Sequence, residues 1–232
     1  QEYTFFEGLA PLGWPDNGFP APQGGYYCGV GSDEIFGRRV VNAHLQACID
    51  AGIHISGINA EVMPGQWEFQ IGPVAAPLIG DEMWLARWLL YRIAEDHLGP
   101  KGIPISATLS PKPVAGDWNG AGCHTNFSTT EMRDGYEACI AAAEALGAGD
   151  KPALHIANYG EGVETRLTGE HETARHNEYF YGVSDRGASV RIPWQVEKAG
   201  KGYIEDRRPN ANCDPYVVTQ LVIDTVCSVA TS

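Results

Sequence analysis

Apolar residues spaced three and four positions apart predict a first helix near residues 38–51. Val41, Leu45, Cys48 and Ile49 fall on one face of such a helix. A second helix is predicted over residues 81–98, because Asp81 suits a helix start and Gly99-Pro100 suits a stop. Its large apolar side chains are expected to be buried: Trp84, Leu85, Trp88 and Leu89.

The remaining segments complete an α+β pattern. Strand-like stretches lie near residues 53–61, 66–71, 104–109 and 123–128. An alanine-rich helix is predicted over about 129–147. A last helix is predicted from Asp214-Pro215, a capping residue followed by proline, to about residue 229. No repeat or linker interrupts the chain. We therefore predict one α+β domain with an antiparallel sheet and helices packed outside it.

Two acidic residues, Glu61 and Glu68, lie on neighbouring predicted strands. Alternation along residues 66–71 places the large apolar side chains on one face and Glu68 on the other. A lone glutamate on a strand usually points to water. Here a tight reversal at residues 63–65 would bring Glu61 beside Glu68, and neighbouring carboxylates repel unless a positive charge lies between them. Hard divalent cations such as Mg²⁺ take oxygen ligands, so the pattern favours a carboxylate-lined metal pocket. Two further candidates for it are Glu2 and Glu205.

Polar and basic residues in the second half admit two interpretations. His124, Asn126 and Ser128 would share one strand face, although a single histidine is most often a satisfied core residue. The arginines are either surface groups balancing an acidic protein or planar forks that bind carboxylate and phosphate. The arginines concerned are Arg166, Arg186, Arg191 and Arg207. Acidic metal ligands beside such arginines suit phosphoryl transfer from a nucleotide.

Composition narrows the function classes. The net charge is -13, from 16 basic and 29 acidic residues. Such a surface argues against nucleic-acid or membrane partners, and no apolar run is long enough to span a bilayer. The six cysteines form no CxxC pair, and six in a chain of this length indicate free thiols.

Several sequence motifs carry a resemblance to a known family. They are QEYT (1–4), GWP (13–15), PQG (22–24), NAEVMP (59–64), QWEFQIGP (66–73), NGAGCHTNFST (119–129), RLTGEHET (166–173), GASVRIP (187–193) and YIEDRRP (203–209). In this order the chain resembles the catalytic domain of type II (eukaryotic-type) glutamine synthetase from the first residue almost to the last. The resemblance implies a curved antiparallel sheet that forms an open, funnel-like active site with helices outside.

The resemblance also implies roles for individual residues. The ligands of one metal ion would be Glu2, Glu61 and Glu68, and those of a second His124 and Glu205. The amino-acid substrate would be held by Asn119, Gly120, His124, Arg166 and Arg207. Arg186 and Arg191 would face the transferred phosphate. The nucleotide site would comprise Asn126, Ser128, Arg133, Tyr203 and Arg191. Glu172 would lie on a mobile loop that closes the pocket and helps to deprotonate ammonium.

The implied enzyme is an ATP-dependent ligase that makes glutamine from glutamate and ammonium through γ-glutamyl phosphate. It would use two or three Mg²⁺ or Mn²⁺ ions per site. The resemblance also implies a homo-oligomer, a double-ring decamer with active sites between subunits. The alternatives are a noncatalytic structural relative and a γ-glutamyl ligase that uses another amine. The metal and arginine positions carry the expected residue types, which favours catalysis.

The chain also departs from the family pattern. The family has an N-terminal β-rich domain of roughly one hundred residues, and a glutamate two positions before Glu2. Neither is present in residues 1–232. We therefore expect these residues to be the catalytic domain of a longer protein. Its location stays open between the cytoplasm and the plastid stroma.

Overall fold

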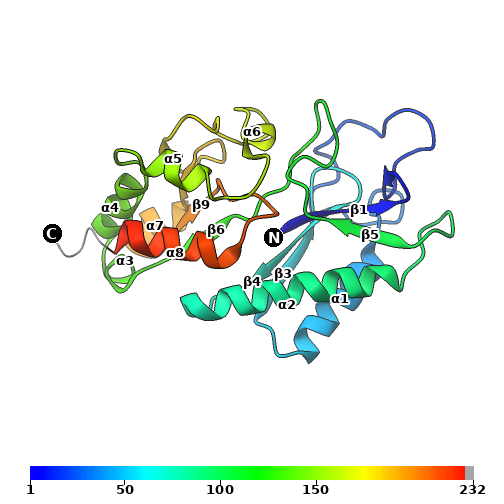
Figure 1. Cartoon of the computed structure of the whole chain (residues 1–232), viewed down its shortest axis with the longest axis horizontal. Helices are drawn as coiled ribbons and strands as arrows, with labels where there is room; N and C mark the ends of the chain where they lie inside the picture. Colours follow the sequence, from blue (N-terminus) through cyan, green and yellow to red (C-terminus); the bar gives the residue numbers. More distant parts are fainter. Residues whose placement is uncertain (228–232) are drawn as a thin grey trace. The chain divides into compact units, whose positions relative to one another are not determined.

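The computed structural model describes residues 1–227, which fall into two compact units. The first comprises Gln1–Ala121 and the second begins at Gly122 (Figure 1). Each unit contains its own sheet and helices, so the α+β class is confirmed. The strands divide between two sheets, whereas a single sheet was predicted.

The sheet of the first unit is antiparallel throughout. Its strands are β1 (Glu2–Glu7), β2 (Ala10–Pro11), β3 (Ile55–Ala60), β4 (Gln66–Ile71) and β5 (Ile105–Thr108). They follow the order β2-β1-β4-β3, and β5 pairs with β1. The β3–β4 hairpin and β5 confirm three of the predicted strands within a few residues. Strand β1 is therefore central, with hydrogen-bonded neighbours on both edges.

Two long helices accompany this sheet, α1 (Arg38–Asp50) and α2 (Ala76–Glu95). Nε2 of His44 on α1 lies 2.9 Å from the carbonyl oxygen of Ala86 on α2, which ties the two helices together. Helix α1 agrees with the predicted bounds within one residue, although Ile49 of the predicted apolar face is 52% exposed. Helix α2 begins five residues before the predicted start at Asp81, because Pro77 in the first turn is compatible with a helix start.

The predicted burial of the α2 aromatic residues is wrong. Trp84 is 46% exposed and Trp88 59% exposed in this chain, and Leu85, which was also expected to be buried, is 42% exposed. The buried stripe consists instead of Met83, Ala86 and Leu90, positions three and four apart. Trp84 and Trp88 are also four apart, so they form a separate stripe on the opposite face of the helix.

The sheet of the second unit has four short strands. They are β6 (Thr125–Phe127), β7 (Tyr181–Val183), β8 (Val190–Ile192) and β9 (Ile204–Asp206), in the order β6-β9-β8-β7. Strand β6 lies within the predicted strand 123–128. Strands β7 and β8 pair in parallel, whereas all pairing was predicted to be antiparallel.

Between residues 122 and 227, the second unit has six helices: α3 (Thr130–Asp134), α4 (Tyr136–Leu146), α5 (Lys151–Ile156), α6 (Val163–Arg166), α7 (Trp194–Ala199) and α8 (Pro215–Val226). The helix predicted over 129–147 is divided between α3 and α4, because Gly135 adopts an extended conformation with φ -156° and ψ 145°. Asp214 caps α8 as predicted, since its Oδ1 accepts from the backbone N–H of Tyr216 at 3.0 Å. The predicted end near residue 229 lies outside the described residues.

The core of the second unit joins helices to sheet. Met132, Cys139, Val190, Ile204 and Val222 are all at least 95% buried and pack in one cluster. The six cysteines are free thiols, as predicted. No helix of residues 1–227 combines the length and the apolar character needed to cross a bilayer.

Candidate active site

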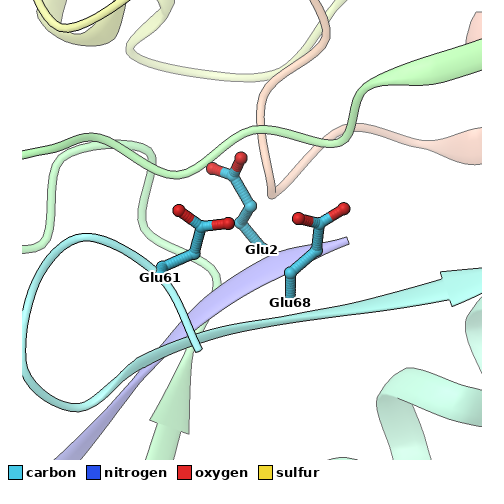
Figure 2. A group of neighbouring side chains, drawn as sticks. All are labelled: Glu2, Glu61 and Glu68. Atoms are coloured by element: carbon cyan, nitrogen blue, oxygen red, sulfur yellow. The ribbon is translucent and has the colours of Figure 1, made fainter. Parts of the chain in front are cut away.

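Three carboxylates converge in the first unit. Glu2 lies on β1, Glu68 on β4, and Glu61 directly after β3. Figure 2 shows their carboxylates side by side, reaching to the same side of the strands. One oxygen from each lies within 4.8 Å of the others. The predicted proximity of Glu61 and Glu68 is confirmed.

Backbone pairing explains this convergence. Glu2 faces Glu68 across the β1–β4 ladder. The reversal between Glu61 and Glu68 is closed by two hydrogen bonds, from the Gln66 N–H to the Met63 carbonyl at 3.1 Å and from the Glu61 N–H to the Gln66 carbonyl at 2.9 Å. Gly65 allows this turn, because its φ of +79° is unfavourable for other residues.

The carboxylate cluster is electrostatically unfavourable by itself. Burial, followed by the negative charges of Glu2 and Glu68, raises the pKa of Glu61 to about 9. A divalent cation bound by oxygen ligands would remove this repulsion and favour the ionised form of Glu61. The donor set therefore fits a hard ion such as Mg²⁺ or Mn²⁺.

Two amide side chains that the sequence did not single out support this cluster. Nδ2 of Asn59 donates to Oε1 of Glu61 at 3.1 Å and to Oε2 of Glu68 at 3.3 Å. Nε2 of Gln70 donates to Oδ1 of Asn59 at 2.8 Å. The alternation that places Glu68 and Gln70 on one strand face was the available signal for Gln70. Asn59 became recognisable only with the strand register.

The Asn119–Gly120 segment lies in the same unit and is held by glutamine side chains. The backbone N–H of Asn119 donates to Oε1 of Gln23 at 2.7 Å. The Asn119 side-chain amide donates to Oε1 of Gln66 at 3.1 Å, and Gln66 donates to the Gly120 carbonyl at 2.8 Å. These contacts fix the segment that the family resemblance assigns to substrate binding.

Glu205 is the centre of a second charged cluster, in the second unit. It is 4% exposed. Its Oε2 lies 2.5 Å from Nε of Arg191, and its Oε1 accepts from Nη1 of Arg207 at 3.1 Å. The Arg191 contact is an ion pair without hydrogen-bond alignment. Nδ1 of His124 lies 3.5 Å from the same Oε1.

His124 is suited to act as a neutral ligand. Burial, followed by the positive charges of Arg207 and Arg166, lowers its pKa well below the ordinary value. A neutral imidazole nitrogen binds metal ions. His124 and Glu205 supply fewer donors than the carboxylate cluster, and Glu205 is already paired with two arginines. They therefore fit a second ion only with further ligands from substrate, water or another segment.

Arg166 is engaged in the protein itself. Its Nη2 donates to the carbonyl oxygens of Arg207, Arg208 and Pro209 at 3.0, 2.7 and 3.1 Å, and its Nε donates to Oδ1 of Asn210 at 2.8 Å. Its side chain thus supports the segment that follows β9. The family resemblance did not imply this structural role.

The predicted loop glutamate lies near two arginines. Oε2 of Glu172 accepts from Nη1 of Arg186 at 3.4 Å, and both side chains are about half exposed. The backbone carbonyl of Glu172 accepts from Arg207 at 3.4 Å. His171 and Glu172 have φ values of 51° and 58°, an uncommon conformation for non-glycine residues. An exposed ion pair contributes little stability, so the Glu172 side chain is only weakly restrained by Arg186.

The predicted nucleotide residues are spread over several elements of the second unit: Asn126 lies in β6, Ser128 follows it, Arg133 lies on α3, Arg191 in β8, and Tyr203 directly before β9. Asn126 and Ser128 are exposed, and Tyr203 is 43% exposed. Nη1 of Arg133 donates to Oγ of Ser128 at 2.9 Å. Only Asn126 lies within β6, so the expected strand face of His124, Asn126 and Ser128 is interrupted at both ends.

A buried network behind Glu205 was missed by the sequence analysis. Asp206 forms two hydrogen bonds with Arg208, at 2.8 and 2.7 Å, and accepts from the Tyr159 hydroxyl at 2.8 Å. His155 lies 2.5 Å from that hydroxyl and 2.8 Å from Oγ1 of Thr225. Burial alone would raise the pKa of Asp206, but the charge of Arg208 lowers it overall. The network anchors the strand that carries Glu205.

Comparison with known proteins decides the family. The model of the glutamine synthetase catalytic domain matches residues 15–155. The chain belongs to this family. A glutamine synthetase of Streptomyces viridochromogenes is 70% identical over 98% of this chain and 65% of its own length. A cytosolic glutamine synthetase isozyme of Glycine max is 58% identical over 97% of this chain and 62% of its own length.

The extent of these matches limits what they establish. The chain spans slightly less than two thirds of the lengths of these curated family members. The solved structure of ligand-free GmaS superposes with a TM-score of 0.72 at 20% identity, covering 99% of this chain and 52% of that one. This likeness supports the fold, and the family membership rests on the match of the catalytic-domain model to residues 15–155.

Proposed function

We propose that the chain is the catalytic domain of an ATP-dependent glutamine synthetase that joins ammonium to glutamate. The observation that carries the proposal is the convergence of Glu2, Glu61 and Glu68 within 4.8 Å, in a chain 70% identical to a glutamine synthetase. Three buried or half-buried carboxylates at this distance can bind a divalent cation, which a site for ATP phosphates requires.

The proposed metal ligands are Glu2, Glu61 and Glu68 for one Mg²⁺ or Mn²⁺ ion, and His124 and Glu205 for a second. When bound, these ions would neutralise phosphate charge and orient the γ-phosphate of ATP. Asn59 would hold Glu61 and Glu68 apart at the spacing needed for a shared ion, since it donates to both carboxylates.

The proposed reaction has two balanced steps. A γ-carboxylate oxygen of glutamate attacks the γ-phosphorus of ATP, which releases ADP and leaves γ-glutamyl phosphate. Ammonia then attacks the acyl carbon, the C–O bond to phosphate breaks, and the departing phosphate takes up the proton that the nitrogen loses. Phosphorylation is needed because a free carboxylate is a poor acyl donor, and the acyl phosphate must be shielded from water.

The chain's own side chains supply the remaining functions. Arg191 and Arg186 stabilise charge on the transferred phosphoryl group, and Arg191 also contacts the nucleotide. Asn119, Gly120, His124, Arg166 and Arg207 orient glutamate. Glu172 accepts a proton from ammonium, and the weakness of its pairing with Arg186 leaves it available for this role. Asn126, Ser128, Arg133 and Tyr203 contact the nucleotide.

The assembly and location follow the same proposal. The functional unit is a homo-oligomer with sites shared between subunits, and the ring size is tested by the solution mass of the full-length protein. A cytoplasmic location agrees with the Glycine max relative that is named as a cytosolic isozyme.

The test is an assay of the full-length protein that measures phosphate release and glutamine formation together. We expect both products with glutamate, ATP and ammonium. We expect far less of either when methylamine replaces ammonium, or when the buffer contains no amine. Glu68→Ala and Arg191→Ala should abolish turnover, while the exposed control Glu34→Gln should retain it. Phosphate release without glutamine, or preferred use of another amine, would overturn the proposed substrate.

A further inference from the structure

The polar face of β4 serves two different parts of the site. Gln66, Glu68 and Gln70 alternate with buried apolar residues and so share this face. Gln70 reaches Asn59, which contacts the carboxylate cluster. Gln66 reaches the Asn119–Gly120 segment instead. The two glutamines are therefore a matched pair with distinct partners.

Both ends of the Gln66 amide are used. The side chain is 1% exposed, its Nε2 donates to the Gly120 carbonyl at 2.8 Å, and its Oε1 accepts from Nδ2 of Asn119 at 3.1 Å. A carbonyl on one side and an amide N–H on the other permit only one orientation of the Gln66 amide. That orientation in turn engages one N–H of Asn119.

We infer that Gln66 is a positioning residue that sets the Asn119 side chain for glutamate binding; this rests on the proposed function. Gln23 holds the Asn119 backbone N–H at 2.7 Å, which fixes the main chain but leaves the side-chain amide to rotate. Gln66 removes that rotation. Oδ1 and the second N–H of Asn119 are then presented in a fixed direction to the α-amino or α-carboxylate group of the substrate.

The experiment compares Gln66→Met with Gln70→Met in the full-length enzyme. We expect Gln66→Met to raise the KM for glutamate about tenfold, because a lost hydrogen bond of this kind changes affinity by about 1.4 kcal/mol. Its kcat should stay within about threefold and its Mn²⁺ Kd should not change. Gln70→Met should show the opposite pattern, with weaker Mn²⁺ binding and a smaller change in the glutamate KM.

A double-mutant cycle separates positioning from general stability. If Gln66 acts through Asn119, Gln66→Met should have little further effect on the glutamate KM in an Asn119→Ala background. Full additivity of the two changes would overturn the inference. An equal loss of Mn²⁺ and glutamate affinity in Gln66→Met would overturn it as well, because that result indicates a general disturbance of β4.

The inference and the proposed function fail in different ways. A wild-type enzyme that forms no glutamine refutes the proposed function. A wild-type enzyme that forms glutamine, with an unchanged glutamate KM in Gln66→Met, refutes the inference alone. Should Gln66→Met not fold, Gln66→Glu provides the same test, since it keeps the shape and the acceptor for Asn119 but faces the Gly120 carbonyl with oxygen. Failure of both variants to fold would assign Gln66 a purely structural role.

Discussion

Replacing Glu61 by glutamine is expected to stabilise the metal-free protein. The pKa of Glu61 is about 9 in the folded chain and 4.5 without the fold, so folding at neutral pH requires this carboxylate to take up a proton. Each pH unit above 4.5 costs about 1.4 kcal/mol of folding free energy until the folded pKa is reached. Glutamine is neutral at every pH and avoids this cost.

The expected gain in free energy of unfolding of Glu61→Gln over wild type grows with pH. The reason is that the wild-type cost rises with each pH unit above the unfolded-state pKa. The gain is about 2 kcal/mol at pH 6, about 3 at pH 7 and about 5 at pH 8, as upper bounds. The sign follows from proton binding: the folded protein binds one more proton than the unfolded protein between pH 4.5 and 9, so wild-type stability falls as pH rises. Urea unfolding followed by tryptophan fluorescence, with EDTA present, measures the difference.

Added Mn²⁺ should reverse the order of stability. Wild type gains the binding free energy of the ion, whereas Glu61→Gln lacks one of the three carboxylate ligands. The exposed control Glu34→Gln should differ from wild type by less than about 0.5 kcal/mol in either condition. The electrostatic account is refuted if Glu61→Gln is less stable than wild type in EDTA, or if its advantage does not increase with pH.

Three further changes test other parts of the structure. Gly65→Ala should lower stability by roughly 2 kcal/mol and weaken Mn²⁺ binding, since φ is +79° and a Cβ would lie 2.6 Å from the Leu12 carbonyl oxygen. Thermal unfolding with and without Mn²⁺ measures both effects. Unchanged stability would contradict this account of the turn. Asp206→Asn should destabilise by about 3 to 5 kcal/mol by leaving Arg208 buried without its charge partner. In wild type, the stabilisation from ionised Asp206 should be complete above about pH 4 and be lost as pH falls through its depressed folded pKa. Calorimetry at decreasing pH measures this loss. If the stabilities of wild type and Asp206→Asn fall in parallel, the ion pair does not make this contribution. Glu172→Gln should reduce kcat for glutamine formation far more than glutamate affinity measured by calorimetry, and equal losses would exclude the proton-acceptor role.

Local pattern was sufficient where neighbouring segments determine the structure. The alternation around Glu68 and the turn after Glu61 predicted their proximity, because a hairpin register depends on a few adjacent residues. Helix α8 was predicted from its cap at Asp214 for the same reason. The metal and substrate roles came from family motifs, and they stay predictions.

Tertiary relationships were beyond local pattern. Which stripe of α2 faces the core depends on its packing partners, so the aromatic residues at 84 and 88 were placed on the wrong side. The division of the alanine-rich helix depends on Gly135 taking an extended conformation, which its sequence neighbours do not require. The contacts of Gln66 span more than fifty residues, and only the folded chain shows them.

The alternation of side chains along the segment after Ile204 has a consequence for folding accuracy. Glu205 and Arg207 pair on one side, while Asp206 and Arg208 pair with each other in the buried network. If this segment shifted by one residue, the Asp206–Arg208 pair would take the place of the Glu205–Arg207 pair. Each pair has one acid and one arginine, so the charges at those two positions would not change. Charge alone therefore cannot reject the misaligned strand. The correct alignment must therefore be selected by side-chain length and by the Tyr159 hydroxyl, which donates to Asp206. Shortening or lengthening either acid by one methylene should permit mispairing of the segment.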